Sequence, residues 1–357
     1  MRILHTEASC GWGGQEIRIL TEARVFLAHG HDVHLLANAD SEILAAAPRF
    51  GVPATAIDLK RKSLSSMRAV RAFLRDWRPD VVNPHSSVDG WMVALARIGL
   101  APRPRVVRTR HISAAVPRNL GSRWIYNRGC DFVMTTGEMI VEQLTVDGFV
   151  ARDRIASVPT GIDTDLYAPA DKAASRAALG LAPTGRLIGT VATLRSWKGH
   201  SFLIDAFARL DEPDARLVIV GDGPQEENLR ARIAALGLGE RVLLAGRRDD
   251  VPTWLAAFDQ FVLASWANEG VPQAILQALA SELPILSCPV GGIPECTAGL
   301  ASVRLVEPKS ADALLQGLIA MRDAPPSADD LALGRARVLE RFSLERMYRT
   351  VLGRFQG

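Results

Sequence analysis

The side chains most suited to chemistry are concentrated in residues 268–280, which read NEGVPQAILQALA. Gly270 and Pro272 are typical of a loop that enters a helix, and the residues after Pro272 are good helix formers. The first N–H groups of such a helix have no acceptor within it and could bind a phosphate. Glu269 precedes the helix and Gln277 lies one to two turns into it, where both could bind hydroxyl groups. The segment therefore predicts a site for a nucleotide-sugar.

Two cations lie in a second segment, residues 193–199, which read TLRSWKG. The segment follows a predicted strand and precedes a helical pattern, so Arg195 and Lys198 would lie at the carboxyl end of that strand. Cations at this place suit a diphosphate, because negative charge develops on the leaving group as the bond to the sugar breaks. For Arg195 the alternative is a charged loop residue that only contacts solvent.

A glycine-rich segment, residues 10–16, follows the first predicted strand and includes Gly13 and Gly14. Glycine lets the backbone come close to a ligand, although a tight turn alone would explain the same residues. Glu16 stands where the third glycine of the dinucleotide-binding fingerprint would be, which argues against an NAD-dependent enzyme. His85 and His111 each end a predicted strand, where a lone histidine is more often structural than catalytic.

These segments are separated by short β-branched runs that alternate with helical patterns, which is typical of parallel α/β units. We expect two domains, at residues 1–165 and 166–340, followed by a terminal helix at 341–357. In open α/β sheets, ligands bind at the carboxyl ends of the strands. Strands are expected at residues 2–5, 32–36, 81–83, 106–108 and 132–135, and again at 186–190, 216–220, 241–244, 260–263, 285–287 and 303–306.

Taken together, these motifs resemble those of the retaining glycosyltransferases of family 4. The resemblance implies the GT-B fold, an α/β architecture in which the parallel sheets of two Rossmann-like domains face a central cleft. Members of the family carry a glutamate, seven further residues and a second glutamate. Glu269 occupies the first of these places here, and Gln277 occupies the second. The family's arginine, five residues before its lysine, is Thr193 in this chain, so Arg195 is a displaced substitute beside Lys198.

The resemblance also implies roles for individual residues. Catalysis is expected of His111, which would lie close to the donor sugar, and of Glu269 and Lys198. Arg247 would pack on the nucleotide base, and Gln277 would meet the ribose hydroxyls. The terminal helix would cross back to the first domain. The donor-binding residues are expected to be Gly13, Gly14, Arg195, Lys198, Arg247, Glu269, Gly270, Val271, Pro272 and Gln277.

Asp163-Thr164-Asp165 has the D-x-D pattern of some metal sites. The surrounding residues 158–163 instead resemble a structural segment between the two domains of the family. The family generally needs no divalent metal, so we expect no metal and no cofactor, with the nucleoside-diphosphate sugar as a co-substrate. The four cysteines have no metal-binding spacing, and they indicate free thiols in a reducing cytoplasm.

The formal net charge of the 357 residues is +3, but residues 1–160 are basic overall and residues 161–357 are acidic. Seven basic residues occur between Lys60 and Arg78, with apolar residues at helical spacing among them. This pattern fits an ordinary amphipathic helix, or a surface that binds anionic lipid headgroups at the inner face of the plasma membrane. No membrane-spanning run or signal peptide is visible. An aromatic content of 6% argues against a nucleic-acid partner.

We therefore expect a retaining, metal-independent transferase that moves a sugar from a nucleoside-diphosphate sugar to a glycan or lipid-linked acceptor. The process expected is the assembly of a cell-surface polysaccharide or lipopolysaccharide. Two alternatives remain open. The departures at Thr193 and Gln277 motivate a sugar-nucleotide-binding protein without transferase activity, although Lys198, Glu269 and His111 argue against it. The same fold also suits an epimerase or hydrolase.

Overall fold

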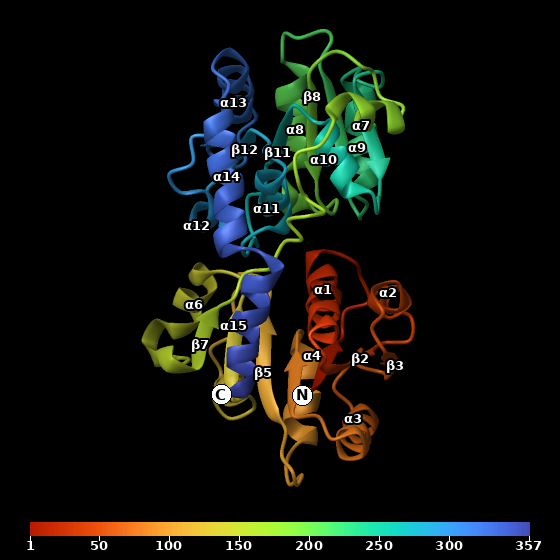
Figure 1. The fold of residues 1–357 in the computed structure, drawn as a ribbon, viewed down its shortest axis with the longest axis vertical. Coiled ribbons are helices and arrows are strands. Elements are labelled where there is room, and N and C mark those ends of the chain that lie inside the picture. The colour runs from red at the N-terminus through yellow and green to blue at the C-terminus, as the bar shows by residue number, and fades with distance from the viewer. The chain divides into compact units, whose positions relative to one another are not determined.

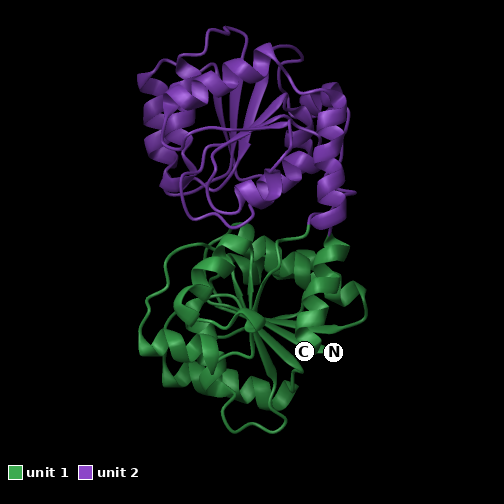
Figure 2. Cartoon of the chain, turned by 90° about the vertical axis from the view of Figure 1, so that its left-hand side faces the viewer, with its two compact units in different colours: residues 1–161, 344–357 green, residues 162–343 purple.

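The computed structural model describes residues 1–357, which divide into two compact units (Figure 2). Unit 1 comprises residues 1–161 and 344–357, and unit 2 comprises residues 162–343. The chain enters unit 2 at Ile162 and leaves it after Ser343, and these two residues form a parallel β-bridge. The boundaries predicted at residues 165 and 340 therefore shift by a few residues, because this bridge marks both ends of unit 2.

Unit 1 contains a seven-stranded parallel sheet in the order β3-β2-β1-β4-β5-β6-β7. Strands β2, β3, β5 and β7 of this sheet are labelled in Figure 1. The five predicted strands are all present, whereas the short edge strands β3 and β7 were not predicted. β3 consists of three small, partly exposed residues, so no apolar run marks it. The strands are β1 (Arg2–Glu7), β2 (Asp32–Ala37), β3 (Ala54–Ala56), β4 (Val81–Pro84), β5 (Arg105–Arg110), β6 (Phe132–Thr135) and β7 (Ile155–Ser157).

Neighbouring residues of these strands point to opposite faces of the sheet, and both faces are buried. Ile3 packs in one apolar cluster and Leu4 in the other, and Val81 and Val82 divide in the same way. Continuous apolar strands are what a parallel sheet covered on both faces requires. The first face is covered by α1 (Gly14–Ala28), α2 (Glu42–Ala46) and α15 (Leu344–Gln356), and the second by α3 (Leu64–Trp77), α4 (Ser87–Ala96), α5 (Leu120–Asn127) and α6 (Glu138–Thr145).

The C-terminal helix α15 is part of unit 1. Its ring side chains pack on Phe26 of α1, with Tyr348 at 4.9 Å and Phe355 at 5.4 Å between ring centroids. The terminal helix predicted at residues 341–357 thus begins at Leu344 and belongs with the first part of the chain.

Unit 2 contains a six-stranded parallel sheet in the order β10-β9-β8-β11-β12-β13. Its strands are β8 (Leu187–Val191), β9 (Arg216–Val220), β10 (Val242–Gly246), β11 (Gln260–Leu263), β12 (Ile285–Ser287) and β13 (Val303–Leu305). All six were predicted, within one or two residues at either end. The helices are α7 (Lys172–Ala178), α8 (His200–Ala208), α9 (Glu226–Ala235), α10 (Val251–Ala257), α11 (Gln273–Ala280), α12 (Ile293–Thr297), α13 (Ala311–Asp323) and α14 (Ala328–Arg341).

Both sheets have the same topology. The chain begins in the middle of the sheet, moves to one edge, and then crosses back to the other side of the first strand. The loops that leave the carboxyl ends of the two central strands diverge at this switch point, which opens a crevice for ligands in such folds. The switch point lies between β1 and β4 in unit 1 and between β8 and β11 in unit 2.

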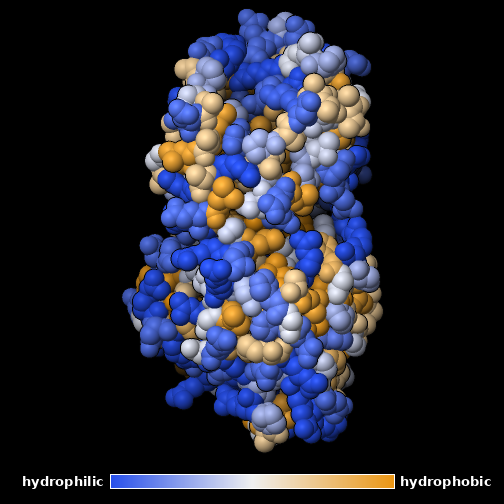
Figure 3. Space-filling model, in the orientation of Figure 1, coloured by the Kyte–Doolittle hydropathy of each residue, from blue (hydrophilic) through white to orange (hydrophobic).

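Hydrophilic residues cover much of the face shown in Figure 3, with hydrophobic residues scattered among them. None of the helices combines the length and the apolar character needed to cross a membrane.

Candidate active site

The switch point of unit 2 brings together two charged residues that are far apart in the sequence. Lys198 ends a 3₁₀ turn (Ser196–Lys198) after β8, and Glu269 lies in the loop after β11. Lys198 Nζ donates to Glu269 Oε1 at 2.6 Å. The two side chains are only 18% and 6% exposed. An ammonium group has three N–H donors, so Lys198 could keep this carboxylate and also donate to a phosphate oxygen.

Trp266 ties the loop of Glu269 to the turn of Lys198. Its backbone N–H donates to the Trp197 carbonyl at 2.8 Å, and its indole N–H donates to the Ser196 carbonyl at 3.0 Å. Gly199 closes the turn with a left-handed φ of 72°, and a Cβ at this position would lie 2.0 Å from the Ala264 carbonyl oxygen. The two loops therefore approach so closely that only glycine fits at position 199.

The loops after β9 and β10 join the same edge of the sheet. The Gly221 N–H donates to the Gly246 carbonyl at 2.8 Å, and the Leu194 N–H donates to the Asp222 carbonyl at 2.7 Å. Arg247 directly follows Gly246, so it lies on this edge as well. The structure thus brings Arg247 to the same row of loops as Lys198 and Glu269.

Arg195 lies on the turn of Lys198 but is not part of its ion pair. Its side chain is exposed, and its guanidinium carbon lies 5.7 Å from the centre of the Trp197 ring. The side chain therefore has room to move toward a ligand at this edge.

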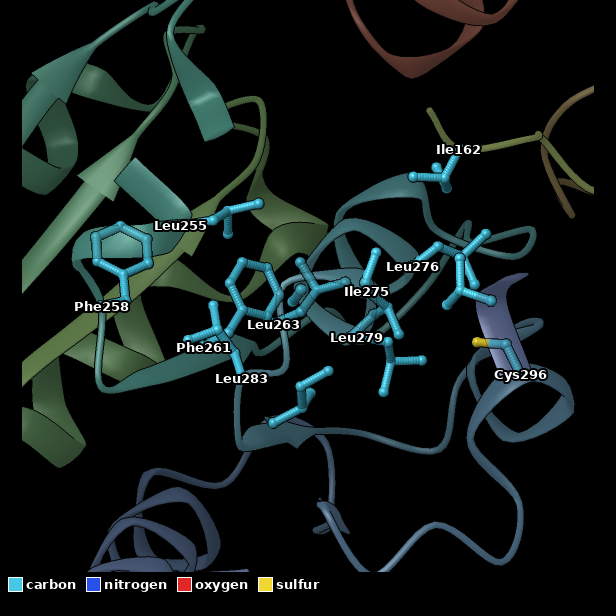
Figure 4. Packing of buried hydrophobic residues seen from close by; sticks show 14 of the residues in the cluster. Ile162, Leu255, Phe258, Phe261, Leu263, Ile275, Leu276, Leu279, Leu283 and Cys296 are labelled. Carbon is cyan, nitrogen blue, oxygen red and sulfur yellow. The ribbon is translucent and has the colours of Figure 1, made fainter. Parts of the chain in front are cut away.

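Helix α11 begins where the sequence predicts, with Pro272 as its N-cap. Its buried face includes Ile275, Leu276 and Leu279, which pack in the core cluster that also holds Phe261 of β11 (Figure 4). The backbone N–H groups of residues 270 and 271, just before the helix, donate to no acceptor in the chain. These two donors and the positive end of the helix dipole suit an anion.

Gln277 lies on the half-buried side of α11, and its side-chain amide has no hydrogen-bond partner in the chain. The amide can both donate and accept, so it is available to a ligand hydroxyl.

A pair of glycines holds Glu269 and its loop from the side of β12. Gly291 has a φ of 59°, and a Cβ there would lie 2.2 Å from the Glu269 carbonyl oxygen. The next residue, Gly292, donates its N–H to the Gly270 carbonyl at 3.0 Å. The loop of Glu269 and Gly270 is thus fixed by a neighbour that has no space for a side chain.

The switch point of unit 1 contains a row of three histidines. His85 Nε2 lies 2.9 Å from His5 Nδ1, and His85 Nδ1 lies 2.9 Å from His111 Nε2. Burial, helped by the Arg18 charge, lowers the pKa of His5 to about 3. Burial also holds the pKa values of His85 and His111 well below the usual histidine value. All three rings are therefore neutral at physiological pH.

Beside the histidines, Glu7 ends β1 in a buried polar cluster. Its carboxyl group accepts hydrogen bonds from Ser86 Oγ, from the Gln15 amide, and at 2.6 Å from the Ser9 N–H. Burial, reinforced by the nearby Asp89 charge, raises the pKa of Glu7 to about 8. A carboxyl group that is largely protonated at neutral pH occurs more often at functional sites than elsewhere.

The glycine-rich segment forms the start of α1 at this same edge. Gly13 is the N-cap and accepts from the Ile17 N–H at 3.1 Å, and Gly14 is the first helical residue. The φ of Gly13 is 178°, an extended conformation that any residue can adopt.

The Asp163-Thr164-Asp165 motif lies at the start of unit 2. The Asp163 carboxylate accepts from the Leu166 N–H at 3.1 Å, which stabilises a local turn. No group of three or more histidine, cysteine, aspartate or glutamate side chains in the chain is arranged to hold a metal ion.

Sequence reasoning did not single out His5, Glu7 or Trp266. A signal for the first two was available, because a histidine and a glutamate interrupt the apolar pattern of β1 close to its carboxyl end. Trp266 had no such signal, since its two hydrogen bonds depend on how two distant loops pack.

Comparisons with known proteins agree with this arrangement. The Glycosyltransferase Family 4 model matches residues 12–166, and the Glycosyl transferases group 1 model matches residues 185–323. The lipopolysaccharide core biosynthesis mannosyltransferase LpsB of Rhizobium meliloti is 29% identical over 313 residues, which are 83% of this chain and 86% of that protein. The Escherichia coli UDP-Gal:alpha-D-GlcNAc-diphosphoundecaprenol alpha-1,3-galactosyltransferase is 29% identical over 282 residues, covering 73% of this chain and 71% of that enzyme.

Among solved structures, Anabaena HepE in complex with UDP and glucose has a TM-score of 0.88 and 20% identity, with both chains covered completely. Two Rossmann-like units with this topology define the GT-B fold, and the chain has it. The matches of the two family models, one in each unit, show that the chain belongs to the family 4 glycosyltransferases.

Proposed function

We propose that this glycosyltransferase moves a sugar from a nucleoside-diphosphate sugar to a glycan or lipid-linked acceptor, with retention of the anomeric configuration. The observation that carries the proposal is the shielded pair of Lys198 and Glu269 at the switch point of unit 2, beside two unpaired N–H groups. Such a site offers positive charge for a diphosphate and a carboxylate for sugar hydroxyls. The names of the relatives and of the HepE complex agree with a nucleotide-sugar donor.

In this proposal, different residues of unit 2 bind different parts of the donor. Glu269 accepts hydrogen bonds from the sugar hydroxyls, and the N–H groups of Gly270 and Val271 bind the distal phosphate. Lys198 neutralises the charge that develops on the diphosphate, and Arg195 reaches the same oxygens from its exposed position. Gln277 binds the ribose hydroxyls.

His111 and the loop of Gly13 and Gly14 contribute from unit 1 in this proposal, with His111 acting close to the donor sugar. The acceptor hydroxyl oxygen forms a bond to the anomeric carbon as the bond from that carbon to the diphosphate oxygen breaks. The hydroxyl proton passes to the leaving diphosphate, so no covalent enzyme intermediate is needed. NMR analysis of the product anomer tests this step, and an inverted product would refute it.

We also propose that the reaction needs no divalent metal. Lys198, Arg195 and the N-terminus of α11 supply positive charge where a metal would otherwise act. Full activity after treatment with EDTA is the expected result. A loss of activity that Mg²⁺ or Mn²⁺ restores would contradict the proposal.

The proposed acceptor belongs to cell-surface polysaccharide or lipopolysaccharide assembly, as the names of two relatives suggest. To reach a lipid-linked acceptor, the enzyme would bind to an anionic membrane, and α3 is the surface that we propose for this contact. Leu64 at its start is 66% exposed. Of the seven basic residues in and around α3, three hydrogen-bond within the chain, namely Lys60, Arg71 and Arg75, and Lys62 Nζ lies 4.7 Å from the centre of the Trp91 ring. Arg61, Arg68 and Arg78 are exposed and remain for lipid headgroups, each adding about 1 kcal/mol near the surface.

Flotation with liposomes tests this surface. We expect association with anionic vesicles, its loss in Arg61→Glu/Arg68→Glu, and its retention in Arg230→Glu/Arg304→Glu, which makes the same charge change in unit 2. No association of the unaltered protein with anionic vesicles would refute the membrane surface while leaving the transferase proposal intact.

The central experiment is a thermal-shift screen of UDP- and GDP-sugars, followed by transfer assays with the donor that binds. A donor at 100 times its Kd adds about 2.7 kcal/mol to the free energy of unfolding. Binding without transfer to any glycan or lipid-linked acceptor would identify a binding protein. Release of free sugar or of an epimer without an acceptor would identify a hydrolase or an epimerase.

A further inference from the structure

The three histidines of unit 1 form one hydrogen-bonded row because of strand register. His5 of β1 pairs with Asn83 of β4, and the Thr109 hydroxyl of β5 donates to the Asn83 side chain at 2.9 Å. These residues therefore share one face of the sheet. His85 and His111 each lie two residues further along, which returns them to that face. The row begins in the middle of β1 and ends at the carboxyl edge of the sheet.

The two hydrogen bonds of the row couple the tautomers of all three rings. A neutral imidazole has one N–H donor and one bare nitrogen, and the pKa directions given above keep these rings neutral. His85 must therefore donate to one neighbour and accept from the other. Only two arrangements exist, one in which every ring donates toward His111 and one in which every ring donates toward His5.

The two arrangements differ at the ends of the row. If the rings donate toward His5, then His5 Nε2 carries a hydrogen, and this atom is buried without any hydrogen-bond partner. If they donate toward His111, the same atom is a bare nitrogen. Buried N–H groups without an acceptor are rarer in proteins than buried acceptors without a donor. The structure thus favours donation toward His111.

We propose that His5 and His85 are positioning residues that fix the tautomer of His111, so that His111 presents Nδ1–H to the ligand. His111 Nε2 accepts from His85, which leaves Nδ1 as the ring nitrogen available at the edge of the sheet. The Thr136 hydroxyl donates to the His111 carbonyl at 2.8 Å and holds its backbone in place.

This assignment gives His111 a defined chemical character. It is a hydrogen-bond donor to oxygen atoms of the bound sugar or diphosphate, and it cannot take a proton from the acceptor through Nδ1. The link from the tautomer to catalysis rests on the proposed function. The tautomer itself can be measured in the protein without substrate, so the tautomer assignment and the proposed function can be refuted independently.

Two-bond ¹H–¹⁵N correlation spectra of the full chain, labelled with ¹⁵N in histidine, test the proposal. The chain has seven histidines, and single His→Gln variants assign their signals. Near pH 7.5 we expect Nδ1 of His111 to be protonated and Nε2 to be bare. A His111 with a bare Nδ1, or with signals averaged between the two tautomers, would overturn the proposal.

Two variants then test whether the row causes this state. In His85→Leu, His111 loses the N–H that donates to its Nε2, and in His5→Leu, His85 loses the N–H that donates to its own Nε2. In both variants the His111 signals should therefore shift toward a mixture of tautomers. His34→Leu is the matched control, since His34 lies in the same unit but outside the row, where it hydrogen-bonds to Thr55 and packs on the Phe73 and Trp77 rings. An unchanged His111 tautomer in both row variants would overturn the coupling. His85→Gln and His5→Gln, which keep a polar group in place, serve if the leucine variants fail to fold.

Activity provides a second reading once the donor is known. The outer partners that orient metal-bound histidines typically contribute about 10- to 100-fold to activity, and we take a loss of the same order for the partner that orients His111. We expect this loss in kcat for His85→Leu, with the donor KM little changed and with partial rescue in His85→Gln. An equal loss in the His34→Leu control would show a general structural effect and contradict the positioning role.

Discussion

Replacement of Lys198 by methionine separates the contribution of the Lys198–Glu269 ion pair to stability from its contribution to catalysis. Methionine keeps most of the side-chain volume and removes the charge. Glu269, which is only 6% exposed, then stays buried without its partner. Breaking a buried pair in this way costs about 3–5 kcal/mol of stability. We expect the lower end, because the Lys198 side chain is 18% exposed and water can reach part of the site.

The same replacement should damage catalysis more than stability explains. Removing a group that stabilises developing negative charge typically lowers kcat by about 100- to 1000-fold, which corresponds to about 2.7–4 kcal/mol. The double variant Lys198→Met/Glu269→Gln has no lone buried charge, so it should recover most of the lost stability. Its activity should stay low, since both proposed donor contacts are altered.

Calorimetric unfolding and steady-state transfer assays measure the two effects, and calorimetry can separate the transitions of the two units. Lys172→Met is the matched control. Lys172 also forms an ion pair in unit 2, with Asp259 at 2.7 Å, but Asp259 retains Arg176 as a second partner. We expect a cost of about 0–1 kcal/mol and unchanged kcat for this control. Turnover near normal in Lys198→Met would refute the proposed site.

Three further outcomes follow from the structure. Gln277→Glu should lower the donor KM by up to about fivefold with kcat unchanged, because a charged acceptor binds hydroxyls by about 1 kcal/mol more tightly; a clear rise in KM would remove Gln277 from the site. Gly291→Ala should destabilise unit 2 by about 1–3 kcal/mol more than Gly299→Ala, because both glycines have positive φ but only at position 291 would the added Cβ lie 2.2 Å from the Glu269 carbonyl oxygen; equal losses would show that backbone strain alone causes the effect. At pH values between the usual pKa of a glutamate and about 8, Glu7 is protonated in the folded state but ionised in the unfolded chain. The protonated carboxyl group therefore stabilises the folded state at low pH, and this stabilisation is lost as the pH rises through 8. Glu7→Gln should therefore remove a fall in stability of up to about 1.4 kcal/mol per pH unit across that window, and an unchanged pH profile in urea unfolding would contradict the raised pKa.

Much of the fold could be predicted from the sequence because parallel strands buried on both faces are continuous apolar runs. The bounds predicted for the strands at residues 132–135, 216–220 and 260–263 agree with the structure. β3 and β7 were missed because their three residues are mostly small and only partly buried, so neither strand forms an apolar run. The start of α11 was predicted because Pro272 can precede the first helical residue but has no N–H to offer within the helix.

The site could be predicted only in part. Each charged residue follows a recognisable strand, so the edge of the sheet on which it lies could be inferred. The contact of Lys198 with Glu269 could not, since it depends on strand order, which places β8 beside β11. The role of His5 could not be predicted for the same reason. A histidine that interrupts an apolar strand can be noticed in the sequence, but its role appears only when β4 and β5 bring two further rings to the same face.

Unit 2 is an insertion within unit 1, and the β-bridge between Ile162 and Ser343 pairs its two ends. The Ile162 N–H donates to the Phe342 carbonyl at 2.7 Å, so the two connections between the units run side by side. Unit 2 can therefore be expressed as one uninterrupted segment, residues 162–343. A protein truncated after Gly161 would instead lack Phe355 and expose Phe26, whereas a short linker from Gly161 to Leu344 would restore the whole of unit 1.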